Sequence, residues 1–176
     1  MNEQQLASIE RKNTWLYDLV EVEFPTPESL KGRDVYFKAL EQATYQVVDK
    51  DTLLESNSEF SSDDIFLVDF HRLTIMFSVL QSQRWDQQYD KDMIVEYLTQ
   101  IILTPDFELY VGFKSGAPIG AAIISHLEGN TLISDVAVSE SKYKSSFVAD
   151  LAKRLSTEHK LLDSVIIESQ FAHSNA

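Results

Sequence analysis

The spacing of apolar residues changes character at Pro105. Before that point apolar residues recur three or four positions apart, which is typical of helices with one buried face. An apolar run at residues 65–68 predicts a short strand among them. The spacing predicts helices over residues 3–20, from Thr26 to about residue 48, from residue 69 to about residue 80, and over residues 93–102.

After Pro105 the period is two, which predicts strands over residues 107–113, 119–125 and 132–138, joined by two short turns. A helix from about residue 148 to 160 and a strand at residues 165–167 follow. Strand, helix and strand form a right-handed crossover, so the last strand should lie parallel to residues 132–138. The predicted class is a mixed α/β (α+β) fold: an antiparallel meander of three strands, a helix and a parallel strand.

The acidic, serine-rich stretch DKDTLLESNSEFSSDD at residues 49–64 predicts a boundary. It divides the chain into a mainly helical, acidic N-terminal extension, residues 1–63, and a core, residues 64–176.

Composition narrows the possible functions. The formal net charge of −13 disfavours nucleic-acid binding, because such a surface repels phosphate backbones. The chain has no cysteine, which excludes disulfides, thiolate metal ligands and a cysteine nucleophile. Its four histidines are scattered, so their spacing predicts no metal site. No apolar run is long enough for a membrane helix, and MNEQQLASIERK is unlike a secretory signal, so a cytoplasmic location is expected.

Two segments resemble the GNAT superfamily of acyl-coenzyme A N-acyltransferases. LYVGFKSGAPIGAAIIS at residues 109–125 is similar to the second and third strands of that family, and LISDVAVS at residues 132–139 is similar to its fourth strand. The resemblance implies a GNAT-like mixed sheet and transfer of an acetyl or other acyl group from acyl-coenzyme A to a small-molecule or protein amine. It also implies that a helix after the fourth strand holds the pyrophosphate on its backbone amides, where the helix dipole favours an anion.

The resemblance assigns residues to that site. Backbone amides of Val136 to Val138 are expected to polarise the thioester carbonyl, and the pyrophosphate loop maps onto Lys144, Ser145, Ser146 and Phe147. Asp135, the one carboxylate in its strand, is the candidate general base; the alternative is an outward-facing or turn-capping aspartate.

The loop departs from the family pattern, with Glu140 where proline is frequent and Tyr143 where a basic or amide residue belongs. Lys144, Ser146 and Val148 stand where glycine or small residues let the backbone approach phosphate, and Asp150 adds a negative charge near the helix start. A degenerate loop favours a second hypothesis, a non-catalytic binding or interaction protein.

The family usually continues with a further helix and two strands, which often supply a tyrosine as general acid, whereas this sequence ends at SQFAHSNA. The N-terminal extension is therefore expected to cover the sheet edge that those elements protect, or else a partner copy in a homodimer covers it.

Overall fold

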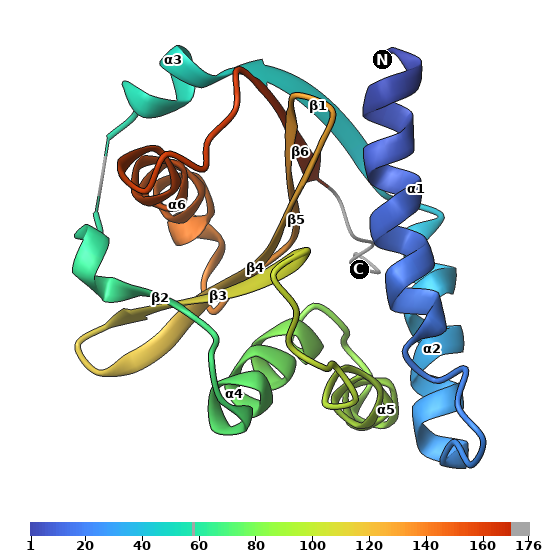
Figure 1. Ribbon diagram of the computed structural model, residues 1–176. Helices are drawn as coiled ribbons and strands as arrows, with labels where there is room; N and C mark the ends of the chain where they lie inside the picture. The colour runs from blue at the N-terminus through green and yellow to red at the C-terminus, as the bar shows by residue number, and fades with distance from the viewer. Residues whose placement is uncertain (58, 170–176) are drawn as a thin grey trace.

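The computed structural model describes residues 1–57 and 59–169, which form helices around one curved mixed sheet (Figure 1). Six α-helices and six strands lie within these residues, with two 3-10 turns at Ser62–Asp64 and Ser141–Tyr143. The helices are α1 (Glu3–Asp18), α2 (Pro27–Leu40), α3 (Lys50–Leu54), α4 (His71–Ser82), α5 (Gln88–Leu98) and α6 (Lys144–Thr157). The strands are β1 (Thr44–Asp49), β2 (Ile65–Leu67), β3 (Phe107–Lys114), β4 (Ala117–Leu127), β5 (Asn130–Val138) and β6 (Ser164–Ser169).

The sheet has the order β1-β6-β5-β4-β3-β2. Neighbouring strands are antiparallel except β5 and β6, which are parallel and joined through α6. The predicted meander and parallel strand are therefore confirmed. The parallel pairing covers four positions, from Asn130 opposite Ser164 to Ile133 opposite Ile167. Within the described residues β5 has no strand partner on that side beyond Ile133.

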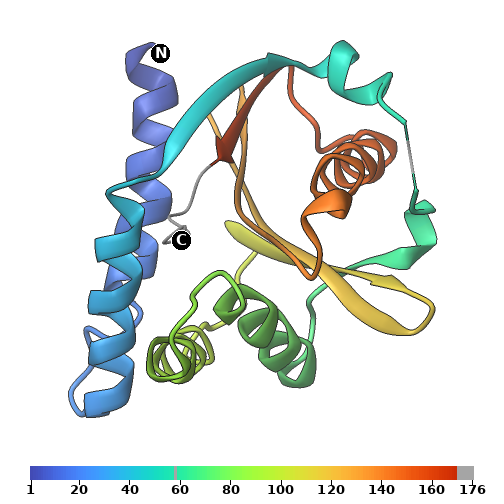
Figure 2. The ribbon, with the colours of Figure 1, turned by 180° about the vertical axis from the view of Figure 1, so that it is seen from behind.

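The two faces of the sheet carry different helices. α6 lies on one face with α3 beside it, and α1, α2, α4 and α5 lie on the other (Figures 1 and 2). Phe147 packs α6 against the sheet. A Cβ atom added at Gly112 would lie 2.8 Å from its ring, and a Cβ atom added at Gly120 would lie 2.7 Å from it. Close packing of this kind leaves no room for a larger residue at either glycine.

The N-terminal extension is part of the sheet. β1 runs antiparallel to β6, from Thr44 opposite Ser169 to Asp49 opposite Ser164 (Figure 2). This confirms the prediction that the extension covers that sheet edge. The prediction of a helix to about residue 48 was wrong. α2 ends at Leu40, because the next residues, rich in β-branched and aromatic side chains, find unpaired backbone groups on β6.

Two smaller predictions need correction. The predicted linker contains α3, whose first turn is capped by the side chain of Asp49 accepting from the Thr52 amide at 3.2 Å. Ile102, assigned to the apolar face of the fourth predicted helix, lies beyond the end of α5 and is 82% exposed. No further helix and strands were expected after the parallel strand. That expectation concerns residues 170–176, which lie outside the described residues.

Candidate functional site

A β-bulge in β5 is the centre of the candidate site. The register between β4 and β5 shifts between Ala121, opposite Ala137, and Ile123, opposite Ser134. Asp135 sits in this shift with φ of 53°, in the left-handed region that non-glycine residues seldom adopt. A bulge of this kind kinks the strand and changes the direction of the residues that follow.

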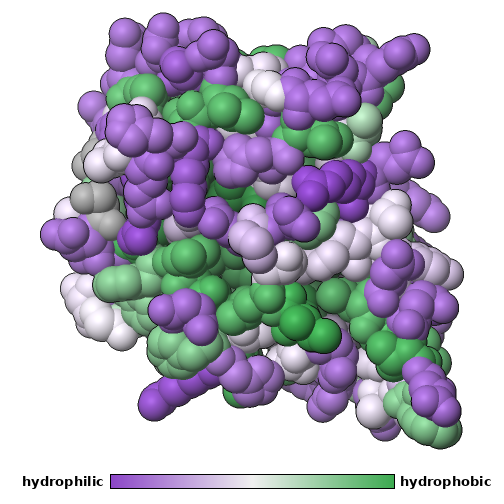
Figure 3. All heavy atoms as spheres, in the orientation of Figure 1, coloured by the Kyte–Doolittle hydropathy of each residue, from purple (hydrophilic) through white to green (hydrophobic). Residues whose placement is uncertain are grey.

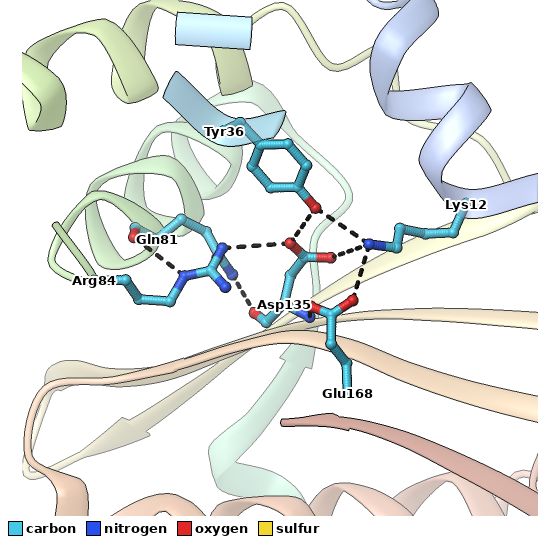
Figure 4. A network of polar contacts seen from close by, with 6 residues as sticks. All are labelled: Lys12, Tyr36, Gln81, Arg84, Asp135 and Glu168. Carbon is cyan, nitrogen blue, oxygen red and sulfur yellow. Dashed lines mark hydrogen bonds and ion pairs between the residues drawn. The ribbon is translucent and has the colours of Figure 1, made fainter. Parts of the chain in front are cut away.

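Each backbone and side-chain polar group of Asp135 is held by a different part of the fold (Figure 4). Its amide donates to Glu168 Oε1 on β6 at 3.1 Å, and its carbonyl accepts from Gln81 Nε2 on α4. Its carboxylate accepts from the Tyr36 hydroxyl of α2 at 2.7 Å. The same carboxylate pairs with Lys12 of α1 and with Arg84, which follows the end of α4, each at 3.3 Å. Five separate segments thus meet at one residue.

Lys12 links the two carboxylates of this network. Its ammonium group lies 3.1 Å from Glu168 Oε2 and donates to the Tyr36 hydroxyl at 3.2 Å. Lys12, Tyr36 and Asp135 are buried, and two cations, Lys12 and Arg84, balance two anions. A balanced, hydrogen-bonded group is the form in which charges persist inside a protein. We call Lys12, Tyr36, Gln81, Arg84, Asp135 and Glu168 the charge network.

The network lowers the proton affinity of Asp135. Burial raises the pKa of its carboxyl group, but the positive charges of Lys12 and Arg84 outweigh burial and bring the pKa to about 2. A carboxylate with so low a pKa is a poor proton acceptor near neutral pH. The contacts of Asp135 hold the bulge in place, and its role as general base stays a prediction.

An apolar cleft of about 880 Å³ lies beside the bulge, between α4 and the end of β5. Its residues come from several segments: Ile75, Met76, Val79 and Leu80 of α4; Gln83 and Arg84, which follow it; Pro118 of β4; Val136, Ala137 and Val138 of β5; and Ser139, Ser141 and Lys144 of the loop and the start of α6. None of these lining residues, all in the described part of the chain, is acidic. In a chain with a net charge of −13, that is a distinct local environment.

The edge of β5 faces this cleft. The amide of Ser139 donates to Ile119 O at 2.9 Å, toward β4. Because successive amides of a strand alternate in direction, the amide of Val138 points away from β4. Val136 and Val138 thus lie at a strand edge next to a cavity, and polarisation of a carbonyl by their amides stays a prediction.

The predicted pyrophosphate loop differs from expectation. A 3-10 turn runs directly into α6, so the Tyr143 amide donates to Glu140 O at 3.0 Å and the Lys144 amide donates to Ser141 O. These amides are used within the loop and are not directed at a ligand. The Ser146 hydroxyl is also used locally, donating to Tyr143 O at 3.2 Å. The turn thus uses the Lys144 amide, one of those assigned to the anion, and anion binding by the rest of the predicted loop stays a prediction.

The remaining loop residues divide between surface and core. Ser145 and Lys144 border a second cavity of about 500 Å³ on the other side of the loop, so Lys144 lines both cavities. Phe147 is buried in the core and its side chain cannot reach a ligand. Val148 is also buried. Asp150 is buried, and its carboxylate accepts from the Phe60 amide.

Sequence reasoning missed five members of the charge network: Lys12, Tyr36, Gln81, Arg84 and Glu168. One signal for Lys12 is present in the sequence. It lies three residues after Ile9 and four before Leu16, so it occupies the buried stripe of its own helix. A lysine in an apolar stripe requires buried counter-charges, and the sequence alone does not say which acids supply them.

Comparison with solved structures finds related folds. A protein from Staphylococcus epidermidis ATCC 12228, described as functionally unknown, matches 75% of this chain and 52% of its own with a TM-score of 0.55 and 16% identity. A GCN5-related N-acetyltransferase from Kribbella flavida matches 80% of this chain and 56% of its own, with a TM-score of 0.49 and 12% identity. A tandem GNAT protein from the clavulanic acid biosynthesis pathway matches 77% and 46%, with a TM-score of 0.39 and 16% identity.

The chain spans about half the length of each of these proteins, and at such identities the likeness concerns the fold. No protein-family model matches the sequence, and a search of curated proteins finds no match. The strand order, the bulge and the parallel β5–β6 pair joined by α6 are the arrangement that the sequence resemblance predicts. The chain has a GNAT-like fold. None of the described helices is long and apolar enough to span a bilayer.

Proposed function

We propose that this protein binds an acyl thioester of the coenzyme A type in the apolar cleft and transfers its acyl group to an amine. One observation carries the proposal. On the side of β5 away from β4, Val136–Val138 have no strand partner among the described residues, and this edge lines a cleft of about 880 Å³. Cavities of roughly 300–1,000 Å³ are typical of small-molecule sites.

The thioester end of such a ligand fits the cleft better than the diphosphate end fits the loop. The amide of Val138 is directed toward a group lying along β5, and a thioester carbonyl oxygen is a suitable acceptor. The diphosphate meets a loop whose Tyr143 and Lys144 amides are already paired. Its contacts would therefore come from the side chains of Lys142 and Lys144, of which Lys142 lies 3.2 Å from Glu140.

In the proposed reaction the amine nitrogen attacks the thioester carbonyl carbon, a carbon–nitrogen bond forms and the carbon–sulfur bond breaks. The nitrogen loses one proton and the departing thiolate gains one, so the products are an amide and a free thiol. This chain contributes alignment of the two reactants and polarisation of the carbonyl by the β5 edge. Asp135 contributes the bulge that shapes this edge, without itself exchanging a proton.

The first test is thermal unfolding and titration calorimetry with acetyl-coenzyme A and coenzyme A at millimolar concentration. A ligand at 100 times its dissociation constant stabilises the folded state by about 2.7 kcal/mol, so binding raises the unfolding midpoint. Lys144→Glu is expected to weaken binding by about tenfold or more through charge reversal beside the cleft. Lys31→Glu, the same change on the exposed surface of α2, is the matched control and leaves affinity unchanged. No stabilisation by either ligand overturns the proposal.

The second candidate is a non-catalytic binding protein, and one observation favours it: the carboxylate that sequence reasoning named as base is held as an ion pair in the interior. The two candidates differ in turnover. Release of free thiol from acetyl-coenzyme A, above the rate of hydrolysis, in the presence of a panel of primary amines supports transfer. Binding without thiol release across the panel supports the second candidate.

A further inference from the structure

One wall of the apolar cleft consists of α4 side chains that the fold itself leaves partly uncovered. Ile75 and Val79 lie four residues apart on the same side of the helix, and they are 42% and 44% exposed. Met76 and Leu80 extend the wall by one position each. In Figure 3 apolar side chains gather on the lower half of the face, where α4 and α5 lie in Figure 1. An exposed apolar stripe lining a cavity is suited to an apolar ligand group.

The charges of the cleft indicate whether the apolar ligand group belongs to the amine or to the acyl chain of the donor. Arg84 and Lys144 are the charged residues among those that line it. A primary amine is protonated near neutral pH, and none of the described residues that line the cleft is an acid that could pair with it, while Arg84 is already paired with Asp135. The acyl chain of the donor is uncharged and continuous with the thioester carbonyl at the β5 edge. The acyl chain is therefore the better occupant of the α4 wall.

The size of the wall sets a chain length. The wall runs from Ile75 to Leu80, about 7.5 Å along the helix axis. With carbon–carbon bonds of about 1.5 Å in a zigzag, roughly six carbons cover that distance. An acetyl group leaves most of the wall in contact with water.

We propose that the preferred donor carries an apolar acyl chain of about six carbons, which lies along Ile75 and Val79. This inference rests on the proposed function and specifies its donor. In this proposal the length of the apolar wall on α4 sets the preferred length of the acyl chain.

The test is calorimetric titration with coenzyme A and its acetyl, butyryl, hexanoyl and octanoyl thioesters. The dissociation constant is expected to fall by about three- to fourfold per methylene up to hexanoyl, as expected for burial of each group, and to level off at octanoyl. Val79→Ser removes apolar surface from the wall and is expected to flatten this dependence on chain length. Val22→Ser, at a valine that is 59% exposed outside the cleft, is the matched control and leaves the slope intact.

The outcomes separate this inference from the proposed function. Acetyl-coenzyme A binding with an affinity that does not change with chain length overturns the acyl-chain assignment and leaves the proposed function standing. An unchanged slope in Val79→Ser, with Val22→Ser equal to it, places the chain elsewhere and also overturns the assignment. Absence of binding by every thioester and by coenzyme A overturns both.

Discussion

On one side of the β5 bulge, Lys12 of α1, Arg84 after α4 and Glu168 of β6 lie buried around Asp135. On the other side, the cleft presents apolar side chains, of which Ile75 and Val79 of α4 are 42% and 44% exposed. The first region has its charges paired within the fold, whereas the second has apolar surface left over. The contrast indicates a division of labour: the charge network fixes the backbone, and the cleft remains available to a ligand.

The difference also explains why a lone aspartate in a strand gave a misleading signal. An active-site carboxylate and a structural one look alike in a sequence, because both are acids in apolar surroundings. The neighbours distinguish them, and here the neighbours of Asp135 are two cations and a tyrosine hydroxyl. Substitutions in the network should therefore affect stability far more than substitutions in the cleft.

The largest effect is expected for Lys12→Met. It leaves the buried network with one uncompensated negative charge and should lower the free energy of unfolding by about 3–5 kcal/mol. Urea denaturation measures the loss. Lys12→Met combined with Glu168→Gln restores charge balance, keeps an acceptor for the Asp135 amide, and should recover most of it. A single variant within about 1 kcal/mol of the parent protein would contradict the view that the network holds the fold together.

A smaller effect is expected from acid. The folded-state pKa of Asp135 is about 2, below its ordinary value of 3.8, so its contribution to stability is present above the ordinary value and is lost as the pH falls toward 2. The stability difference between the parent protein and Asp135→Asn should therefore shrink by about 2 kcal/mol between pH 5 and pH 2. Urea denaturation at a series of pH values follows this difference, and a constant difference would show that Asp135 is not held as an ion pair.

Asp150 offers the opposite case. Burial raises the pKa of its carboxyl group, so the folded state binds this proton more tightly than the unfolded state does. Stability from this group is highest at or below the ordinary pKa of 3.8 and decreases as the pH rises through the folded-state value. Asp150→Asn keeps an acceptor for the Phe60 amide and should stabilise the protein at pH 7 by up to about 1 kcal/mol. The gain in the free energy of unfolding should vanish near pH 3. A loss of stability in Asp150→Asn at pH 7 would contradict a raised pKa of Asp150.

The smallest effect on stability is expected in the cleft. Val79→Ser should change the free energy of unfolding by less than about 0.5 kcal/mol, because the side chain is 44% exposed. Chemical denaturation of this variant next to Lys12→Met tests the comparison directly. A destabilisation of Val79→Ser as large as that of Lys12→Met would show that the cleft wall belongs to the core.

Much of the fold followed from local patterns. The period-two alternation after Pro105 predicted three strands within a few residues of their observed bounds, and the crossover rule predicted the parallel direction of β6. β1 escaped detection because its residues also fit a helical period, and only the open edge of β6, over a hundred residues later, favours the extended form. Tertiary context overrides local propensity in such segments.

The candidate site was less predictable than the fold. Val136 and Val138 were placed correctly at the strand edge, because their position follows from the strand itself. Three features were not predictable: the paired amides of the loop, the inward direction of Asp150, and the partners of Asp135. The last two depend on contacts between segments far apart in the sequence, such as Lys12 with Glu168, which local patterns do not encode.

The pairing of β1 with β6 also has a consequence for how the chain folds during synthesis. β1 leaves the ribosome more than a hundred residues before its partner strand, residues 164–169. Until that strand emerges, β1 has no edge to join, and Lys12 has no Glu168. Domains with such long-range pairings fold slowly and expose aggregation-prone segments while incomplete. The nascent chain is therefore expected to depend on chaperones until residues 164–169 are released, and ribosome-bound chains arrested before residue 164 should be sensitive to protease at β1.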